Sequence, residues 1–318
     1  MAQHAAFIAT TPSRNGGYVL AATGAALFST KGILIKLAYG GGAVPEVDAI
    51  ALLALRMAFS LPVFAIIGLL AWRARAEEGR PALNRREALM AALVGLLGYY
   101  VASYLDFEGL VHLSAQFERL ILMTYPVFVT LLGAAFFGGR ITLTGLLALL
   151  VSYSGIAVIF AHGATAQGDH VMLGVAFVAG AAFTFALYQL LARPLIVRIG
   201  TPIFTSIAMG AAGVAVLAHF MAAASLVTLT EVPSRIVWLA VAMAVVSTVL
   251  PSFMLSAALE RIGAQAVSAI GTVSPVATVV MAMALLGEPF TPADALGTAV
   301  VIAGVGLFTW HDSRRRPA

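Results

Sequence analysis

The sequence predicts an all-α integral membrane protein in which ten transmembrane helices form two inverted five-helix repeats around a central cavity. Three observations lead to this fold class: the composition, the spacing of the apolar segments and an internal repeat. The 318 residues are 61% hydrophobic and only 10% charged, with a mean hydropathy of +0.99. In a typical soluble chain about a quarter of the residues are charged. This chain therefore needs lipid to cover most of its surface.

Ten segments are apolar and long enough to cross the hydrocarbon layer, which takes about 20 residues of helix. Short stretches with turn chemistry, such as "FGGRIT" and "LTEVPS", separate them, and none is long enough to be a soluble domain. The predicted spans are 17–38, 47–71, 87–107, 111–137, 142–162, 170–192, 202–224, 235–258, 263–286 and 292–310.

The Lys and Arg residues predict the orientation, because they concentrate on the cytoplasmic side of membrane proteins. With the N-terminus placed inside, thirteen of the eighteen lie in inner tails and loops, four lie within spans, and one, Arg235, lies in an outer loop. We therefore expect a multi-pass protein of the cell (inner) membrane with cytoplasmic tails at 1–16 and 311–318. The first tail lacks the features of a cleaved signal peptide.

The two halves of the chain resemble each other. When Pro126 is set on Pro275, 149 residues later, "LVHLSAQFERLILMTYPV" lies on "LERIGAQAVSAIGTVSPV". Two apolar helices could share Ala, Leu and Val by composition alone, but the shared Gln, Pro, Gly and Thr argue against that explanation. The repeats are 17–162 and 170–310. Five spans is an odd number, so the second copy must be inverted, which is typical of secondary transporters.

Further segments carry a resemblance to a known family: "LFSTKGILIKLAY", "LLALRMAFSLPVF", "MTYPVF", "TVSPVA", "YSGIAVI" and "IAGVGLF". On these segments the sequence resembles an EamA-type transporter of the drug/metabolite transporter superfamily. The resemblance implies two inverted five-helix repeats around a central cavity and the transport of small organic molecules. Family members usually carry Glu in the turn after the Pro-containing helix. Here Glu288 is that residue in the second copy, while the first copy has Gly139 and Arg140.

Four charged residues lie deep inside predicted spans, nearing the midplane: Lys31, Arg56, Glu118 and Arg119, whereas Lys36 is closer to the outer surface. Each costs about 2.5–3.5 kcal/mol to insert, so such residues face the protein interior or water. We expect them to gather at one level of a shared interior, where the excess positive charge would favour an anionic group of a substrate. The alternative is a salt-bridge network that only locks the helices together.

The sequence leaves two roles open for Glu118, because burial favours a neutral acid while a nearby cation favours the carboxylate. A neutral acid would make it a proton carrier. Glu118 and Arg119 lie on Val267 and Ser268 of the second copy, so the scaffold does not require the charges. Neighbouring helical positions point about 100° apart, so we do not expect these two residues to be each other's partner.

Uncharged polar residues within spans are further candidates for the cavity wall. Their alternative role is hydrogen bonding between helices, or an aromatic belt at the membrane surface in the case of Tyr100. Asp106 and Glu108 are expected to be solvated at the outer end of their span. The binding candidates of this kind are Tyr100, Thr184, Tyr188, Ser247 and Thr272. The candidates for helix gating are Pro62, Pro126, Pro251 and Pro275.

The sequence also limits the function classes. It has no cysteine, and its six histidines lack the spacing of metal ligands. No phosphate-binding loop or nucleophile motif occurs, so we expect no enzyme activity, cofactor, metal site or nucleic-acid partner. The predicted function is secondary transport of small organic metabolites, such as amino acids, by export or exchange. A multidrug or cation exporter and a lipid-modifying membrane enzyme are the alternatives. Proton coupling and oligomeric state stay open.

Overall fold

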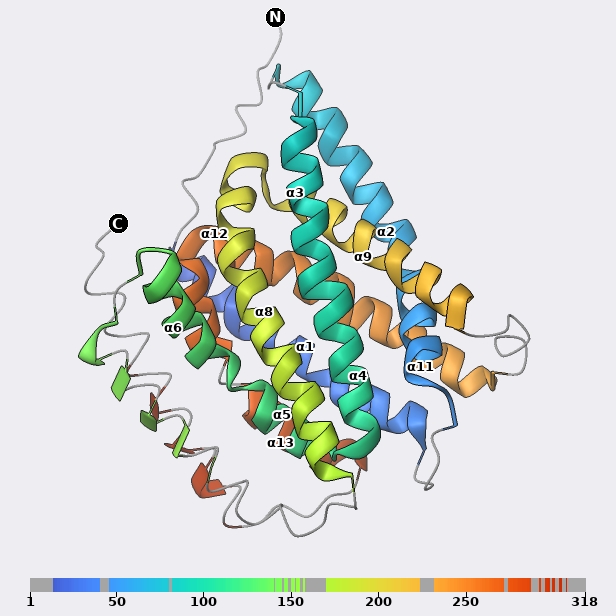
Figure 1. Cartoon of the computed structure of the whole chain (residues 1–318), viewed down its shortest axis with the longest axis vertical. Coiled ribbons are helices and arrows are strands. Elements are labelled where there is room, and N and C mark those ends of the chain that lie inside the picture. Colours follow the sequence, from blue (N-terminus) through green and yellow to red (C-terminus); the bar gives the residue numbers. More distant parts are fainter. Residues whose placement is uncertain are drawn as a thin grey trace, which may run out of the picture.

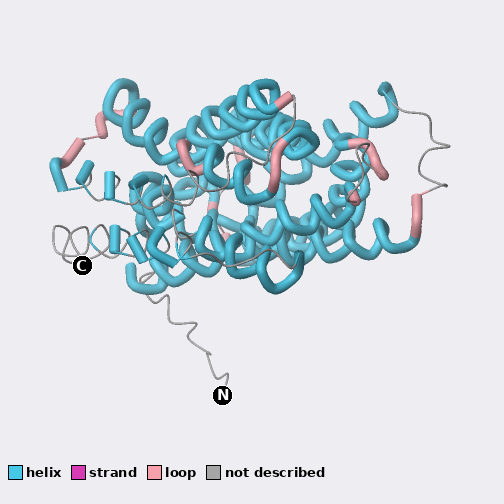
Figure 2. Tube along the Cα trace, turned by 90° about the horizontal axis from the view of Figure 1, so that it is seen from below, coloured by secondary structure: helices cyan, strands magenta, loops and turns pink. Residues whose placement is uncertain are grey.

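The structure is a computed structural model that describes residues 14–40, 46–79, 82–139, 170–223, 232–271 and 274–286, with short stretches between 141 and 157 and between 292 and 307. All regular secondary structure in this part of the chain is helical (Figures 1 and 2). Six of the described helices are long and apolar enough to cross a membrane. The all-α, multi-pass membrane class predicted from the sequence is therefore confirmed.

The long helices form because a chain in lipid must satisfy its backbone hydrogen bonds within each segment. Where a helix meets water, side chains can bond the free backbone groups instead, and Asn84 and Glu87 form such a capping box at the start of α3. Two of the membrane-crossing helices contain a π-helical segment. The six are α1 (Arg14–Tyr39), α2 (Ala49–Glu77), α3–η1–α4 (Arg85–Gly95, Leu96–Val101 and Ala102–His112), α8 (Val171–Ile199), α9 (Thr201–Ala223) and α11–η3–α12 (Ser234–Ala244, Val245–Val249 and Leu250–Gly271).

The predicted span 111–137 is not one helix. The chain forms α5 (Ala115–Leu122) and α6 (Tyr125–Phe136), separated by a turn. Pro126 explains the break, because it has no N–H to donate to the carbonyl of Leu122 and so cannot continue the helix. Prediction from apolar length alone misses this interruption, which leaves a short helix inside the protein.

The predicted span 263–286 starts at a break in the helix and is interrupted again further on. Gly263, with φ 81° and ψ 168°, is non-helical, so α12 consists of two helical segments, 250–262 and 264–271, and the positive φ favours glycine. A second helix, α13 (Ser274–Met281), then leads into the π-helical η4 (Ala282–Leu286). The predicted spans 142–162 and 292–310 lie largely outside the described residues.

The irregular points recur along the chain at the spacing of the sequence repeat. The π-helical segments η1 and η3 begin at Leu96 and Val245, which are 149 residues apart. Ser114 lies in the break before α5, and Gly263, 149 residues later, is the kink in α12. The same interval separates the first residues of α6 and α13. The similarity in sequence is therefore accompanied by similarity in helix interruptions.

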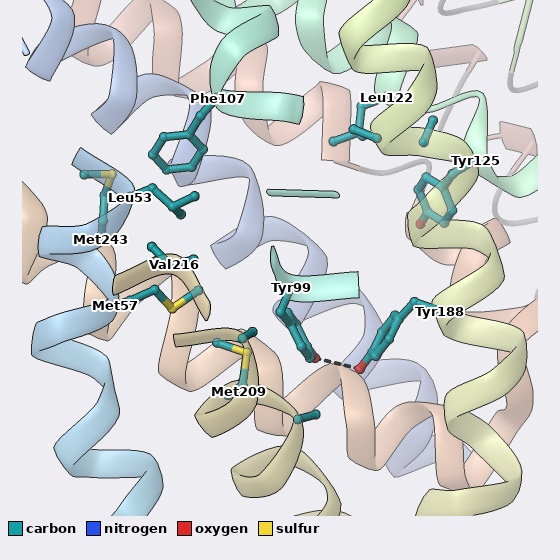
Figure 3. Packing of buried hydrophobic residues seen from close by; sticks show 14 of the residues in the cluster. Leu53, Met57, Tyr99, Phe107, Leu122, Tyr125, Tyr188, Met209, Val216 and Met243 are labelled. Atoms are coloured by element: carbon teal, nitrogen blue, oxygen red, sulfur yellow. Dashed lines mark hydrogen bonds between the residues drawn. The ribbon is translucent and has the colours of Figure 1, made fainter. Parts of the chain in front are cut away.

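The most extensive helix contacts are α1 with α12, α2 with α9, and α4 with α8. In Figure 1, α8 and the α3–α4 rod cross in front of α1 and α12. Small residues allow close approach: a Cβ atom on Gly95 would lie 2.3 Å from the backbone oxygen of Ala208 on α9. Buried Met57, Phe107 and other apolar side chains fill the space between these helices (Figure 3).

Candidate functional site

Five charged side chains lie together in the protein interior, and we call them the charge cluster. They are contributed by α1, α2, α4 and α5, and each of the five residues is at most 2% exposed. Their burial is exceptional because charged groups in a membrane protein are costly unless they are paired or functional. The sequence predicted four of these five residues. The members are Lys31, Arg56, Asp106, Glu118 and Arg119.

Asp106 corrects the expectation of a solvated residue at the outer end of its span. The residue is 1% exposed, and its carboxylate pairs with Nζ of Lys31. The expectation failed because the helix does not end near Asp106 but continues to His112, with α2 and α8 packed against it. Glu108, two residues later, is half-buried.

Glu118 and Arg119 are each other's nearest ionic partner, contrary to the sequence-based expectation. Nε of Arg119 lies 3.8 Å from Oε2 of Glu118, because the long arginine side chain folds back across the angle between the two positions. The contact is loose. Among the described residues, neither the two Glu118 oxygens nor the three Arg119 guanidinium nitrogens have a hydrogen-bond partner. Buried polar groups are rarely left in this state in structural sites.

Aromatic rings support the cations of the cluster. Nζ of Lys31 lies 4.6 Å from the ring centre of Phe28, and Cζ of Arg119 lies 6.0 Å from the same ring. Arg56 is placed similarly over Phe107, at 4.9 Å. Each contact is a cation–π interaction. Phe28 was not predicted from the sequence, because one phenylalanine in an apolar helix carries no signal of its own.

Arg119 also lines a small cavity between α1, α5, α6, α8, α12 and α13. Measured to the centre of a water-sized sphere, its volume is about 20 Å³. That is room for water and far less than a metabolite needs. Its walls are mainly apolar and aromatic. The lining residues are Ala25, Phe28, Arg119, Leu122, Met123, Tyr125, Phe185, Gln189, Leu255, Val267, Gly271 and Ser274.

A second cavity of about 10 Å³ lies beside the first and shares part of its wall, including Phe28, Phe185 and Gln189. We call the two together the central cavity. Tyr99 of η1 and Tyr188 of α8 line the second part, and their hydroxyl groups are hydrogen-bonded at 2.7 Å (Figure 3). The π-helical segment thus places a cavity residue, which is common for such segments at functional sites.

The remaining polar groups of the central cavity link the two halves of the chain. Ser274, at the start of α13, forms a short hydrogen bond with Ser29 of α1 through the two hydroxyl groups. Tyr125 donates to the backbone oxygen of Ser268 at 3.3 Å. Oε1 of Gln189 lines the cavity without a hydrogen-bond partner among the described residues. An entering ligand would therefore meet unused donors and one unused acceptor.

The structure does not bring every sequence candidate to this place. Tyr188 lines the central cavity, but Tyr100 turns away and hydrogen-bonds Nδ1 of His219 at 3.2 Å. Thr184 and Ser247 donate to carbonyl groups of their own helices. Thr272 lies outside the described residues. These three described side chains, Tyr100, Thr184 and Ser247, are absent from the walls of both parts of the cavity.

Three of the four prolines proposed for gating lie at irregular points of helices. Pro126 is in the first turn of α6, Pro251 is the second residue after η3, and Pro275 is the second residue of α13. Pro62, in contrast, lies inside α2 without interrupting it. Whether any of them takes part in gating stays a prediction.

Comparison with known proteins assigns this arrangement to a family. The sequence profile described as the EamA-like transporter family matches residues 15–161 and again residues 172–310. The chain belongs to the EamA-like transporter family. The two matches together cover most of the sequence, and they include every helix that contributes to the charge cluster and the central cavity.

Relatives of this EamA-family chain carry transporter names. It is 30% identical to the "Uncharacterized transporter YcbK" of Bacillus subtilis, over 92% of this chain and 90% of the relative. It is 31% identical to a "Probable terminal-alkyne amino-acid exporter" of Streptantibioticus cattleyicolor, over 73% and 76%. A solved crystal structure with 18% identity matches 96% of this chain and 100% of its own, with a TM-score of 0.72, which shows the shared fold. Family and names indicate a transporter rather than an enzyme.

Proposed function

We propose that this EamA-family protein is a secondary active transporter of small organic metabolites, such as amino acids, in the cell (inner) membrane. One observation carries the proposal. A buried arginine, Arg119, lines the central cavity with three guanidinium nitrogens that have no hydrogen-bond partner among the described residues. A guanidinium group in this position suits a carboxylate, which it can hold through two parallel hydrogen bonds.

Alternating access is the mechanism that the geometry favours. The central cavity is too small for a metabolite in this conformation, so its walls must separate before a substrate can enter. The irregular points of the helices recur at the interval of the sequence repeat, which supports two five-helix repeats at 17–162 and 170–310. In transporters with inverted repeats, broken helices surround the substrate site, and the repeats move relative to each other.

The amino-acid class draws on the walls of the cavity and on one relative. Phe28, Phe185 and Leu255 provide apolar surface, while Arg119 and Gln189 provide a cation and an acceptor. An amino acid with an apolar side chain has groups that complement all of these. The Streptantibioticus relative, named as a probable exporter of an amino acid, supports the same class.

A cation or multidrug exporter is the second candidate, because aromatic walls attract organic cations. Phe28, Tyr125 and Phe185 all line the central cavity. The positive charge of Arg119 on the same wall opposes this candidate, and two cations already occupy the surroundings of Phe28. The balance of these contacts favours a substrate that carries a carboxylate.

A flux screen in liposomes tests the proposal. Reconstituted protein would be offered labelled amino acids, organic acids and cationic drugs, with and without a pH gradient. We expect flux of carboxylate-bearing compounds, and loss of that flux in Arg119→Gln. Arg198→Gln is the matched control, because Arg198 is 74% exposed and pairs with Glu87 away from the cavity. Movement of cations alone would contradict the carboxylate assignment, and no flux of any compound would contradict transport.

A further inference from the structure

We propose that Glu118 is an internal competitor for Arg119: the carboxylate of a substrate displaces Glu118 from the guanidinium group, and the displaced Glu118 takes up a proton. This inference rests on the proposed function and deepens it, because it names the anionic group that is recognised and the ion that is coupled to its binding. Three features of the site support it: the strength of the present pair, the surroundings of Glu118 and the balance of charge.

Arg119 is held loosely enough to exchange its partner. Its contact with Glu118 is an ion pair at 3.8 Å that includes no hydrogen bond. A guanidinium group has five N–H donors in a planar fork. A carboxylate entering the cavity could accept two of them at about 2.7–2.9 Å. The incoming carboxylate would thus gain a geometry that Glu118 does not have in this structure.

Among the described residues, no other cation is free to receive Glu118. The charged groups that face Glu118 are Lys31 of α1, Asp106 of α4 and Arg119 itself. Lys31 is already paired with Asp106. The positive charge of Arg56 of α2 attracts the carboxylate of Asp106, and its guanidinium group packs on the ring of Phe107. A displaced Glu118 would therefore be a second buried carboxylate beside Asp106.

The backbone of α1 also confines Glu118. A Cβ atom added to Gly32 would lie 3.3 Å from Oε2 of Glu118 and 3.7 Å from Nη2 of Arg119. The glycine lets both charged groups lie against the helix and leaves them out of reach of bulk water. Because an isolated carboxylate at such a depth is unfavourable, the displaced group is stabilised by protonation instead.

The balance of charge links the anion to a proton. Lys31 with Asp106 and Arg119 with Glu118 form two ion pairs, and Arg56 leaves the charge cluster with one excess positive charge. A bound carboxylate alone would lower this total charge by one. If Glu118 takes one proton from the aqueous side to become a neutral acid, the total charge of the site is unchanged. Binding of the anion and binding of the proton are then linked.

The experiment uses purified full-length protein and benzoate as the probe, with benzamide as its neutral counterpart. Difference infrared spectroscopy would follow the carbonyl band of protonated carboxyl groups. We expect this band to grow when benzoate binds to the wild-type protein, and to stay unchanged with benzamide or in Glu118→Gln. Glu108→Gln, a half-buried acid two residues from Asp106, is the matched control and should keep the band.

The pH dependence gives a second readout. The complex binds one more proton than the free protein. Benzoate affinity should therefore fall by about tenfold for each unit by which the pH rises, over the range in which Glu118 is ionised in the free protein. In Glu118→Gln the affinity should be higher and independent of pH. Arg119→Gln should bind benzoate and benzamide with the same affinity.

Several results would overturn the inference: a wild-type affinity that does not change with pH, a pH dependence that persists in Glu118→Gln, or absence of benzoate binding. If Glu118→Gln does not fold, Glu118→Asp replaces it, because its protonated band should shift in frequency. Flux is measured separately in liposomes. Proton-linked benzoate binding without flux of any compound would leave this inference in place and remove the transport function.

Discussion

The Nζ atom of Lys31 on α1 and the carboxylate of Asp106 on α4 form an ion pair that solvent hardly reaches, with side chains 3% and 2% exposed. The two residues are 75 positions apart in the sequence. Their pairing ties the first helix of the chain to the end of the third membrane-crossing rod. Asp106 is the one other carboxylate among the described residues that face Glu118. Its pairing with Lys31 keeps Lys31 from pairing with Glu118.

Asp106→Asn should destabilise the protein by about 3 kcal/mol, because removing one partner leaves the other charge buried and unpaired. The double variant Lys31→Met with Asp106→Leu should recover most of that loss, since it removes both charges. Reversible unfolding in mixed detergent micelles measures both variants. A single variant as stable as the wild type would show that the pair does not stabilise the fold.

Gly95→Ala should disrupt the packing of α3 on α9. The new methyl group would meet the backbone oxygen of Ala208 at 2.3 Å, and backbone atoms cannot move aside as a side chain can. We expect a loss of about 1–3 kcal/mol. Gly210→Ala on α9 is the control, because nothing lies within 4 Å of its added Cβ. Thermal unfolding should separate the two variants clearly, and equal melting temperatures would contradict this account of the contact.

Gly263→Ala should affect both stability and flux. Its φ of 81° and ψ of 168° are essentially restricted to glycine, at a cost of about 1–3 kcal/mol for other residues. The added Cβ would also meet Nε of Arg193 at 3.2 Å. Gly200→Ala is the matched control, because Gly200 has a similar φ of 91° but open space around it. We expect Gly200→Ala to lose stability but retain flux, and a normal flux in folded Gly263→Ala would argue against a role for the kink.

Cysteines at positions 29 and 274 should lock α1 to α13. The hydroxyl groups of Ser29 and Ser274 are in direct hydrogen-bond contact, and the natural chain has no cysteine that could form another disulfide. If the central cavity opens by separation of these helices, oxidation of Ser29→Cys/Ser274→Cys should abolish flux, and reduction should restore it. Either single variant under oxidising conditions is the control. Unchanged flux in a fully cross-linked sample would place the opening elsewhere.

The sequence predicted the membrane class and four of the five charged residues of the site, because both follow from the cost of charge in lipid. Lys31, Arg56, Glu118 and Arg119 stand out as charges inside apolar runs, and the structure places all four in the protein interior. Asp106 did not stand out, since its position near the end of an apolar run is equally compatible with water. Its burial depends on how α4 is rotated against its neighbours.

The breaks in the helices were harder to predict, although the responsible residues are visible. Apolar length cannot distinguish one helix of 27 residues at 111–137 from the two shorter helices α5 and α6. Pro126 could have indicated the break, but Pro62 lies within an unbroken helix, so a proline alone does not decide. The direction of side chains was also beyond the sequence: Tyr99 lines the central cavity, while its neighbour Tyr100 contacts His219.

The π-helical segments η1 and η3 have a mechanical consequence. A π turn contains more residues than an α turn, so each segment stores a residue that regular α-helix would not hold there. Returning η1 to α-helix would pass that residue along the rod and rotate one part relative to the other by about 100°. Tyr99, which lies within η1, would swing out of line with Tyr188. A shift of one residue in the helix register is thus enough to change which side chains line the central cavity, while the helices stay packed against each other.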